Sequence, residues 1–143
     1  MTLIELLIVL VIVAILAAVA WPSFRGAVHK SRRSDAVSAL TEIMQAQERW
    51  RSNNPAYKAS LSSPVLPGTR TTSQSGHYAM AIAEGSTTST DYTATATVIS
   101  TSPQASDTNC QVMRVVVSGG NISYTSGATS SATNAQPDPC WVR

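Results

Sequence analysis

The sequence lacks the residue patterns that mark common catalytic and metal sites. Its two histidines, His29 and His77, are isolated from one another and from other metal ligands. Asp91 and Asp107 belong to no Asp-x-Asp-x-Asp-Gly loop, and no serine lies in a Gly-x-Ser-x-Gly turn. We therefore expect no enzyme activity, no bound metal and no cofactor.

Charge is also scarce and unevenly placed. Only 13% of the 143 residues are Asp, Glu, Lys or Arg, and the net charge of +2 requires no polyanionic partner. Seven of the ten Lys and Arg residues lie between Arg25 and Lys58, whereas the C-terminal half is nearly uncharged and rich in Ser, Thr and Ala. A surface hydrated by hydroxyl groups rather than by ions favours an extracellular or structural protein.

Cysteine is limited to Cys110 and Cys140. An even number of cysteines in a chain with a hydrophobic start is consistent with one disulfide bond made in an oxidising compartment. A bond across about 30 residues would stabilise the fold by roughly 3.5 kcal/mol in the chain-entropy model. The alternative is two unpaired buried thiols. We favour it less, because Cys140 ends a tail with Pro137 and Pro139 that has little else to hold it.

The chain has, in contrast, a long apolar N-terminus. Residues Met1 to Trp21 carry one ionisable side chain, Glu5, and the sixteen positions from Leu6 to Trp21 carry none. A helix of about 20 residues spans roughly 30 Å, the thickness of the hydrocarbon core of a bilayer. The segment must therefore be buried in lipid or against copies of itself. A secretory signal peptide is disfavoured, because the chain opens without basic residues.

Glu5 distinguishes this segment from a plain membrane anchor. A charged side chain inside the apolar layer costs about 2.5–3.5 kcal/mol on insertion scales, so a carboxylate there should be paired or neutralised. The nearest cation is an α-amino group, with an ordinary pKa of about 8, from the same chain or from an adjacent copy. If an adjacent copy supplies it, Glu5 is an assembly contact.

The run Thr2-Leu3-Ile4-Glu5-Leu6-Leu7-Ile8-Val9, continued by residues 14–20 and by Pro22, resembles the start of mature type IV pilins. The resemblance covers about the first quarter of the chain closely and the rest in outline. It is specific, because an apolar run with a single Glu at the fifth position and Pro at the twenty-second is an unusual combination. Two residues depart from the family. Met1 stands where Phe is more common, and Ala14 stands where many members have Gly.

The resemblance implies a route of maturation and assembly. In that family a prepilin peptidase removes a short basic leader, the new N-terminus is methylated, and the Glu at position five pairs with the terminal amine of a neighbour. Carried over, Met1 is the N-methylated residue, and Met1 and Glu5 are the filament-assembly contacts. The implied partners are identical subunits in a helical filament and an inner-membrane assembly machinery. The implied location is the inner membrane before assembly and a cell-surface pilus, or fimbrium, afterwards.

The cations after the apolar run raise a question of orientation. The positive-inside rule would place Arg25, Lys30, Arg32 and Arg33 in the cytoplasm. A basic leader restores the opposite bias, so the resemblance places the C-terminal part outside. These cations also allow a nucleic-acid surface. We favour a solvated or headgroup-facing helix side, because no aromatic residues interleave the patch and a filament would hide it.

Pro22 predicts a break in the helix. It lacks an N–H and its ring crowds the preceding turn, so we expect a kink or partial melting near residues 18–22. From residue 23 the pattern is helical again to Ser52, where Asn53-Asn54-Pro55 ends it.

The second half of this helix has an apolar stripe that predicts cover over a sheet. Its members are Val37, Leu40, Ile43, Met44 and Trp50. Before residue 34 the same face is basic, and we expect that half to lie near lipid headgroups or a neighbour's acidic groups. It carries Arg25, His29, Arg32 and Arg33.

The remaining residues predict a small antiparallel sheet with short connections. Residues 53–76 have no period and indicate a variable loop. Strands are expected at residues 77–83, 92–99 and 112–117, with a short return strand at 121–124 after Gly119-Gly120. The Ser/Thr/Ala-rich tail 125–139 would be disordered unless Cys140 ties it back. Trp141 is expected to pack against the edge of the sheet.

Together these elements predict an α+β pilin fold, a long helix packed by its second half on an antiparallel sheet. We expect a hydrophobic assembly or transmembrane helix at 1–22 and a globular head at 23–143. The expected parts of the head are helix 23–52, loop 53–76, sheet 77–124 and a disulfide-bounded C-terminal region at 110–140. Such a disulfide-bounded region is common among pilins.

Three functions stay open from the sequence. The first is the structural subunit of a type IV pilus. The second is a minor pilin or secretion-system pseudopilin that primes or tips a filament, which the short head and a similarity of residues 47–57 to minor pilins favour. The third is a membrane-anchored binding module, for example in DNA uptake, that does not polymerise. Glu5 argues against the third, because an anchor gains nothing from a buried carboxylate.

Overall fold

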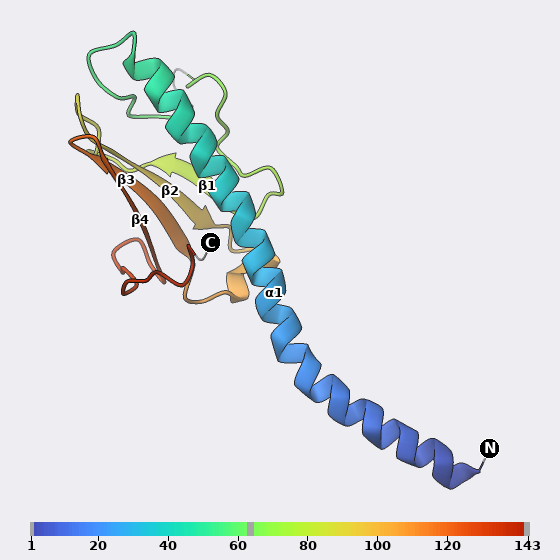
Figure 1. Ribbon diagram of the computed structural model, residues 1–143. Coiled ribbons are helices and arrows are strands. Elements are labelled where there is room, and N and C mark those ends of the chain that lie inside the picture. The colour runs from blue at the N-terminus through green and yellow to red at the C-terminus, as the bar shows by residue number, and fades with distance from the viewer. Residues whose placement is uncertain (1, 63–64, 142–143) are drawn as a thin grey trace. The chain divides into compact units, whose positions relative to one another are not determined.

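The computed structural model describes residues 2–62 and 65–141 (Figure 1). It contains a long helix α1 (Leu3–Arg51), four strands and a short 3-10 helix η1 (Pro103–Ser106). The chain divides into two compact units, Met1–Ser31 and Arg32–Arg143. The first part of α1 belongs to the first unit, and the second part belongs to the second unit with the sheet.

Of the two alternatives expected at Pro22, partial melting is not present in the single chain, and a kink stays a prediction. Helix α1 is continuous from Leu3 to Arg51, so residues 18–22 are not melted. A proline inside a helix removes one backbone donor and costs about 3 kcal/mol. Helical hydrogen bonds propagate cooperatively on both sides of such a site, so a long helix can pass through it.

Four strands form one antiparallel sheet in the order β1-β2-β3-β4. Their bounds are β1 Tyr78–Ile82, β2 Tyr92–Val98, β3 Val112–Ser118 and β4 Asn121–Gly127. The strands predicted from sequence are confirmed, and β4 continues three residues beyond the expected end at residue 124. Gly119 and Gly120 have φ values of 56° and 83° in the turn between β3 and β4. Two successive left-handed residues are what a tight hairpin turn requires.

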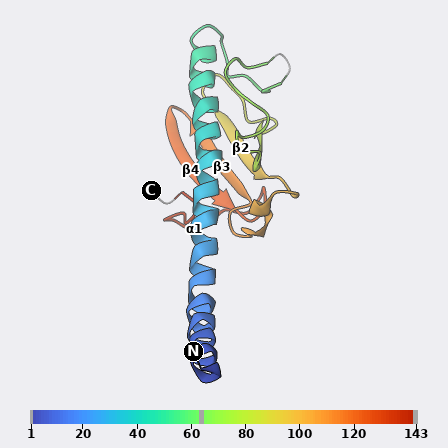
Figure 2. The ribbon, with the colours of Figure 1, turned by 90° about the vertical axis from the view of Figure 1, so that its right-hand side faces the viewer.

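The second half of α1 lies along one face of this sheet, as both ribbon views show (Figures 1 and 2). Ala36, Leu40 and Ile43 of the helix are at most 1% exposed and belong to one core with side chains from β1, β2 and β3. The predicted helix stripe is therefore confirmed. The buried face of the helix also includes Ala36, Ala39 and Ala46, whereas Val37 and Met44 of the predicted stripe are only partly buried.

The segment between α1 and β1 is anchored rather than loose. Leu61 and Leu66 are buried in the core, and Thr72 pairs with Ala79 of β1 in an isolated bridge. The segment thus protects part of the β1 edge, which would otherwise present unpaired backbone groups. Residues 63 and 64 lie outside the described part of this loop.

The C-terminal segment is held against the sheet at several points. Cys110 and Cys140 form the predicted disulfide bond. The indole Nε1 of Trp141 donates to the carbonyl oxygen of Thr125 at 2.9 Å, and its ring lies 4.9 Å from that of Tyr124. Arg114, buried in β3, donates to two carbonyl oxygens of residues 129 and 132. The tail is therefore ordered by contacts, and the expected packing of Trp141 at the sheet edge is confirmed.

Candidate functional site

The N-terminal end of α1 carries a capping box. The side-chain Oγ1 of Thr2 accepts a hydrogen bond from the backbone N–H of Glu5 at 3.3 Å. In return, Oε2 of Glu5 accepts one from the backbone N–H of Thr2, also at 3.3 Å. This reciprocal pair satisfies two donors that a helix start leaves free. Glu5 thus stabilises its own helix, a role that sequence reasoning missed although Thr-x-x-Glu is its signature.

Capping does not exhaust the hydrogen-bonding capacity of Glu5. An ionised carboxylate has about four acceptor positions, so a second donor can join the Thr2 N–H. The carboxylate is exposed in the isolated chain. Met1, its predicted partner from a neighbouring copy, lies outside the described residues. The Met1–Glu5 contact between subunits and the methylation of Met1 therefore stay predictions.

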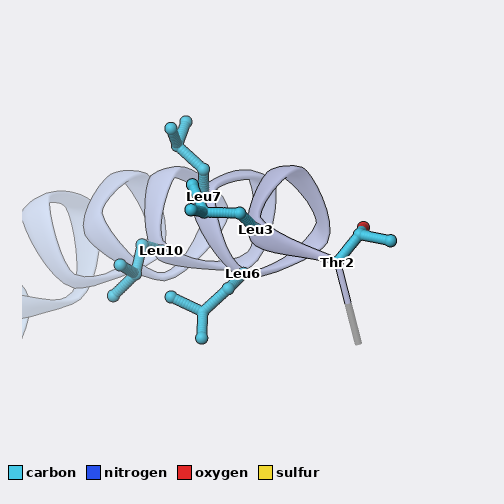
Figure 3. Close-up of a pocket in the computed structure, with 5 residues that line it drawn as sticks. All are labelled: Thr2, Leu3, Leu6, Leu7 and Leu10. Carbon is cyan, nitrogen blue, oxygen red and sulfur yellow. The ribbon is translucent and has the colours of Figure 1, made fainter.

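The side of α1 that follows the capping box is apolar and uncovered. Its large apolar side chains between Leu3 and Trp21 are 50–85% exposed. Figure 3 shows Leu3, Leu6, Leu7 and Leu10 projecting outward from the first turns. With Thr2 they line a shallow, open apolar hollow on the helix surface. Because one helix supplies all of its walls, the hollow is a groove between side-chain ridges, the kind of surface that another helix fills.

By length and composition, α1 is also able to cross a bilayer. An 18-residue window of the helix has a mean hydropathy of 3.2 and is 0% buried within the protein. Such a segment cannot stay in water, because each fully exposed large apolar side chain forgoes about 1.5–3 kcal/mol of burial. The apolar part of α1 must therefore contact lipid or protein.

Arg33 differs from its predicted role. We expected it on a basic face near lipid headgroups or a neighbour's acidic groups. It instead forms a two-point ion pair within the chain, with Nε 2.7 Å from Oδ2 of Asp107 and Nη2 3.0 Å from Oδ1. Its Nη1 also donates to the carbonyl oxygen of Pro139 at 3.2 Å. Paired contacts of this geometry are the strong form of an arginine–carboxylate interaction.

This cluster of Arg33, Asp107 and the Pro139 carbonyl, which we term the Arg33 clasp, joins three segments of the head. Arg33 lies on α1, Asp107 follows η1, and Pro139 precedes Cys140. Asp107 is 7% exposed and also accepts a hydrogen bond from the side chain of Gln104 at 2.8 Å. No sequence pattern pairs residues so far apart, so the clasp could not have been predicted.

Among the described residues, the exposed basic side chains lie in two places. Arg25 and Lys30 are exposed on α1 in the first unit. In the head, Arg49 and Arg70 are exposed near the end of α1 and in the following loop. Arg49 lies against the turn at Gly68, where an added Cβ would stand 3.3 Å from its Nη2.

Lys58 belongs to the head but is largely buried. Its Nζ lies 4.4 Å from the centre of the Trp50 ring, within the range of a cation–π contact. The backbone N–H and C=O of Lys58 both bond the side-chain amide of Gln47, at 2.9 and 2.8 Å. This contact fixes the start of the α1–β1 loop to the helix.

Two buried tyrosines extend across the core. Burial, together with the nearby Asp107 carboxylate, raises the pKa of Tyr78 to about 12. Burial also raises the pKa of Tyr92, whose ring lies 4.6 Å from that of Tyr57. Both phenols are therefore neutral at physiological pH and act as core side chains, with no proton to exchange there.

The histidines and carboxylates of the head form no metal-binding cluster in the described part of the chain. Within residues 2–62 and 65–141, no group of three or more His, Cys, Asp or Glu could hold a metal ion. His77 Nδ1 lies 2.9 Å from Oγ of Ser102, but Ser102 also accepts a hydrogen bond from the backbone N–H of Gln104 as the N-cap of η1. That arrangement serves the start of η1.

A long apolar helix with a capping glutamate at its start, packed by its second half on an antiparallel sheet with a C-terminal disulfide, defines the chain as a type IV pilin. Comparison with known families agrees. Residues 22–114 match the family described as Type IV minor pilin ComP, DNA uptake sequence receptor, and the chain belongs to that family. Pilins assemble into pili with other pilins, and the apolar helix suits a location in a pilus or at a membrane.

A curated relative supports the same class. The chain is 42% identical over 71 residues to the Type IV major pilin protein PilE1 of Neisseria gonorrhoeae. The aligned part is 45% of this chain and 33% of the relative. The chain therefore spans about a third of the length of the curated relative that it matches.

Proposed function

We propose that this protein is a structural subunit of a type IV pilus, which polymerises through its N-terminal helix into a cell-surface filament. The observation that carries the proposal is the apolar surface between Leu3 and Trp21, more than half of which is uncovered in the single chain. Packing against copies of the same helix removes this surface from water, and the groove beside Leu3 and Leu7 is shaped by ridges that a neighbouring helix would fill.

On this proposal, Glu5 fixes how far one helix is shifted along its neighbour in the filament. Once helices pack together and exclude water, a lone carboxylate is costly, and the α-amino group of an adjacent copy is the cation that can offset it. The Thr2–Glu5 capping box holds the carboxylate at the end of the helix, where that amine would arrive. The prepilin peptidase and the inner-membrane assembly machinery are the partners that such a route requires, and no catalytic step is assigned to the chain.

Two variants of Glu5 separate its charge from its capping role. Gln at the same position keeps a side-chain acceptor for the Thr2 N–H, whereas Ala removes both functions. We expect Glu5→Ala and Glu5→Gln to leave the protein in the membrane and to reduce its incorporation into sheared surface fibres to a similar extent. The measurement is quantitative immunoblotting of the fibre and membrane fractions.

The two variants also give clear contrary outcomes. Normal fibre content of both would refute the assembly role of Glu5. Normal content of Glu5→Gln together with a loss in Glu5→Ala would show that capping alone matters. Failure of the wild-type chain to enter any fibre would refute the proposed function itself.

The family description favours a second candidate function, a minor pilin whose head contacts DNA. The family match includes the exposed cations Arg49 and Arg70 on the head and the cation–π pair of Lys58 with Trp50. Basic side chains near one loop supply the phosphate contacts on which non-specific DNA affinity depends. On this proposal the same protein enters the filament as a minor component and presents the end of α1 and its loop to DNA.

The DNA proposal is tested by salt-dependent binding of the full-length protein in detergent to a fluorescent DNA duplex. The double change Arg49→Gln and Arg70→Gln should weaken binding to all sequences and lower the slope of log K against log salt by about 2. The matched control is Arg49→Lys with Arg70→Lys, which keeps both charges and should keep the slope. Equal binding by the wild type and the Gln variant would refute this candidate.

A further inference from the structure

We propose that Trp21, Phe24, Arg25 and Lys30 form an interfacial collar that binds the headgroups of anionic phospholipids before the subunit enters a filament. All four residues lie in the first unit, Met1–Ser31, and all are exposed. The inference rests on the proposed function in one respect, since it requires that α1 is inserted in a membrane before assembly.

Distances along the helix place the collar at a membrane surface. Residues 3 to 21 of α1 span about 27 Å at 1.5 Å per residue, close to the thickness of the hydrocarbon core. Arg25 then stands about 6 Å beyond Trp21, inside a headgroup layer about 5–8 Å deep. Lys30 stands about 13 Å beyond Trp21, and its flexible side chain can bend back toward the headgroups.

The collar has the composition of a membrane interface. Trp21 and Phe24 are 69% and 68% exposed, and aromatic rings at the end of an apolar span prefer the boundary between lipid tails and headgroups. Arg25 follows Trp21 by four residues and lies on the same side of the helix. Lys30 is turned by about 140° from Arg25, at 100° per residue, so positive charge faces lipid on two sides.

Acidic groups do not neutralise the collar along its own helix. The sequence has no Asp or Glu between Glu5 and Asp35, and Glu5 is near the far end of the apolar segment. Arg32 and Arg33 follow the collar, and Arg33 is already paired with Asp107 in the head. Arg25 and Lys30 therefore leave a net positive ring beside the lipid-facing span, and negative lipid headgroups are its complement.

A nucleic acid is the other polyanion that such cations could attract. The collar fits it less well, because its two aromatic residues continue an apolar helix surface and do not alternate with the cations. Two cations also give only a small part of the phosphate contacts of a DNA-binding surface. A bilayer satisfies the aromatic and the basic residues together, and we therefore commit to lipid.

The test measures lipid selectivity of the full-length protein in bilayers. The protein is reconstituted into phosphatidylcholine vesicles with spin-labelled phosphatidylglycerol or spin-labelled phosphatidylcholine, and the ratio of their association constants is read from the motionally restricted signal. We expect the wild type to prefer phosphatidylglycerol. Each single variant, Arg25→Gln or Lys30→Gln, should lower the ratio of association constants by up to about fivefold, and the double variant should show no preference. High salt should weaken the preference of the wild type.

Arg70→Gln is the matched control, because it removes the same charge from an exposed loop of the head and should keep the wild-type ratio. Insertion without lipid preference, or a preference unchanged in the double variant, would overturn the collar and leave the proposed pilus function intact. Failure of the protein to insert into the vesicles would overturn the membrane stage and the collar with it. A double variant that loses binding to a fluorescent DNA duplex but keeps its lipid ratio would assign the collar to nucleic acid and also overturn the proposal.

Discussion

At the scale of single residues, buried polar side chains hold together parts of the head that the hydrophobic core does not define. Gln47 is fully buried, and its amide bonds both backbone groups of Lys58. The N–H and C=O of a peptide group taken out of water need hydrogen-bond partners, and each one left without a partner costs about 1–3 kcal/mol of stability. This amide therefore fixes the α1–β1 loop at residue 58 to the last turns of the helix.

Replacement of Gln47 by Leu should destabilise the head. Leu keeps much of the volume but leaves the N–H and C=O of Lys58 without a partner, so we expect a loss of about 2–4 kcal/mol. The melting temperature should fall by on the order of 10 °C, measured by circular dichroism of the full-length protein in detergent. Gln45→Leu, at an exposed position two residues earlier, is the control and should melt close to the wild type. Equal melting of the two variants would contradict this role.

Tyr78 should make the stability of the head depend on alkaline pH. Burial raises its pKa to about 12 in the folded protein, from an ordinary value of 10.0. A raised pKa means that the folded state holds the proton more tightly, so this contribution is complete below pH 10 and is lost as the pH rises toward 12. Melting temperatures from pH 8 to 11.5 should therefore fall more steeply for the wild type than for Tyr78→Phe, which has no phenol to ionise. Parallel curves would refute this account.

At the scale of elements, periodicity decided what could be predicted. The alternation of Thr and Ala in residues 92–98 and the two glycines at 119–120 each follow from local backbone rules, and the strand and hairpin there are confirmed. The Arg33 clasp depends on residues 74 positions apart, which no local rule connects. The partial melting expected near Pro22 does not occur, because the cooperativity of a 49-residue helix outweighs the local penalty of one proline.

The Arg33 clasp and the disulfide bond should stabilise the head cooperatively. Both acceptors of Arg33 lie beside the disulfide, since Asp107 is three residues before Cys110 and Pro139 directly precedes Cys140. The disulfide holds these acceptors together before the guanidinium binds. In a double-mutant cycle of Arg33→Met against Cys110→Ser with Cys140→Ser, we expect a coupling energy of about 0.5–3 kcal/mol from denaturant unfolding.

The control for this cycle is Arg32→Met, one residue earlier on the same helix. It removes the same charge without touching Asp107, and its effect should add to that of the cysteine changes. Strict additivity of Arg33→Met with the loss of the disulfide would show that the two contacts act independently. A loss of about 2–5 kcal/mol from the cysteine changes alone is expected in either case.

At the scale of the whole molecule, two units meet different environments. The first exposes apolar side chains along a single helix, and the second encloses its own core beneath a surface rich in Ser and Thr. Sequence composition predicts an apolar segment at 1–22 apart from a head at 23–143, because a run of sixteen uncharged residues cannot belong to the surface of a small soluble domain. That boundary stays a prediction, and the two compact units of the structure divide at residue 31. The partner of the apolar unit could not be predicted from composition alone, since lipid and protein remove it from water equally well.

The division into units predicts that the head folds without the apolar helix start. A chain that begins at residue 29 keeps every residue of the core, which starts at Ala36, together with the Arg33 clasp and the disulfide. We expect its melting temperature to lie within about 5 °C of that of the full-length protein in the same detergent. A shift of that size corresponds to a change of roughly 1 kcal/mol in the free energy of unfolding. It should also be monomeric in buffer without detergent, since the 50–85% exposed side chains between Leu3 and Trp21 are gone. A truncated head with helical far-ultraviolet but no near-ultraviolet circular dichroism would contradict this, because it would show that the core needs the first 28 residues to pack.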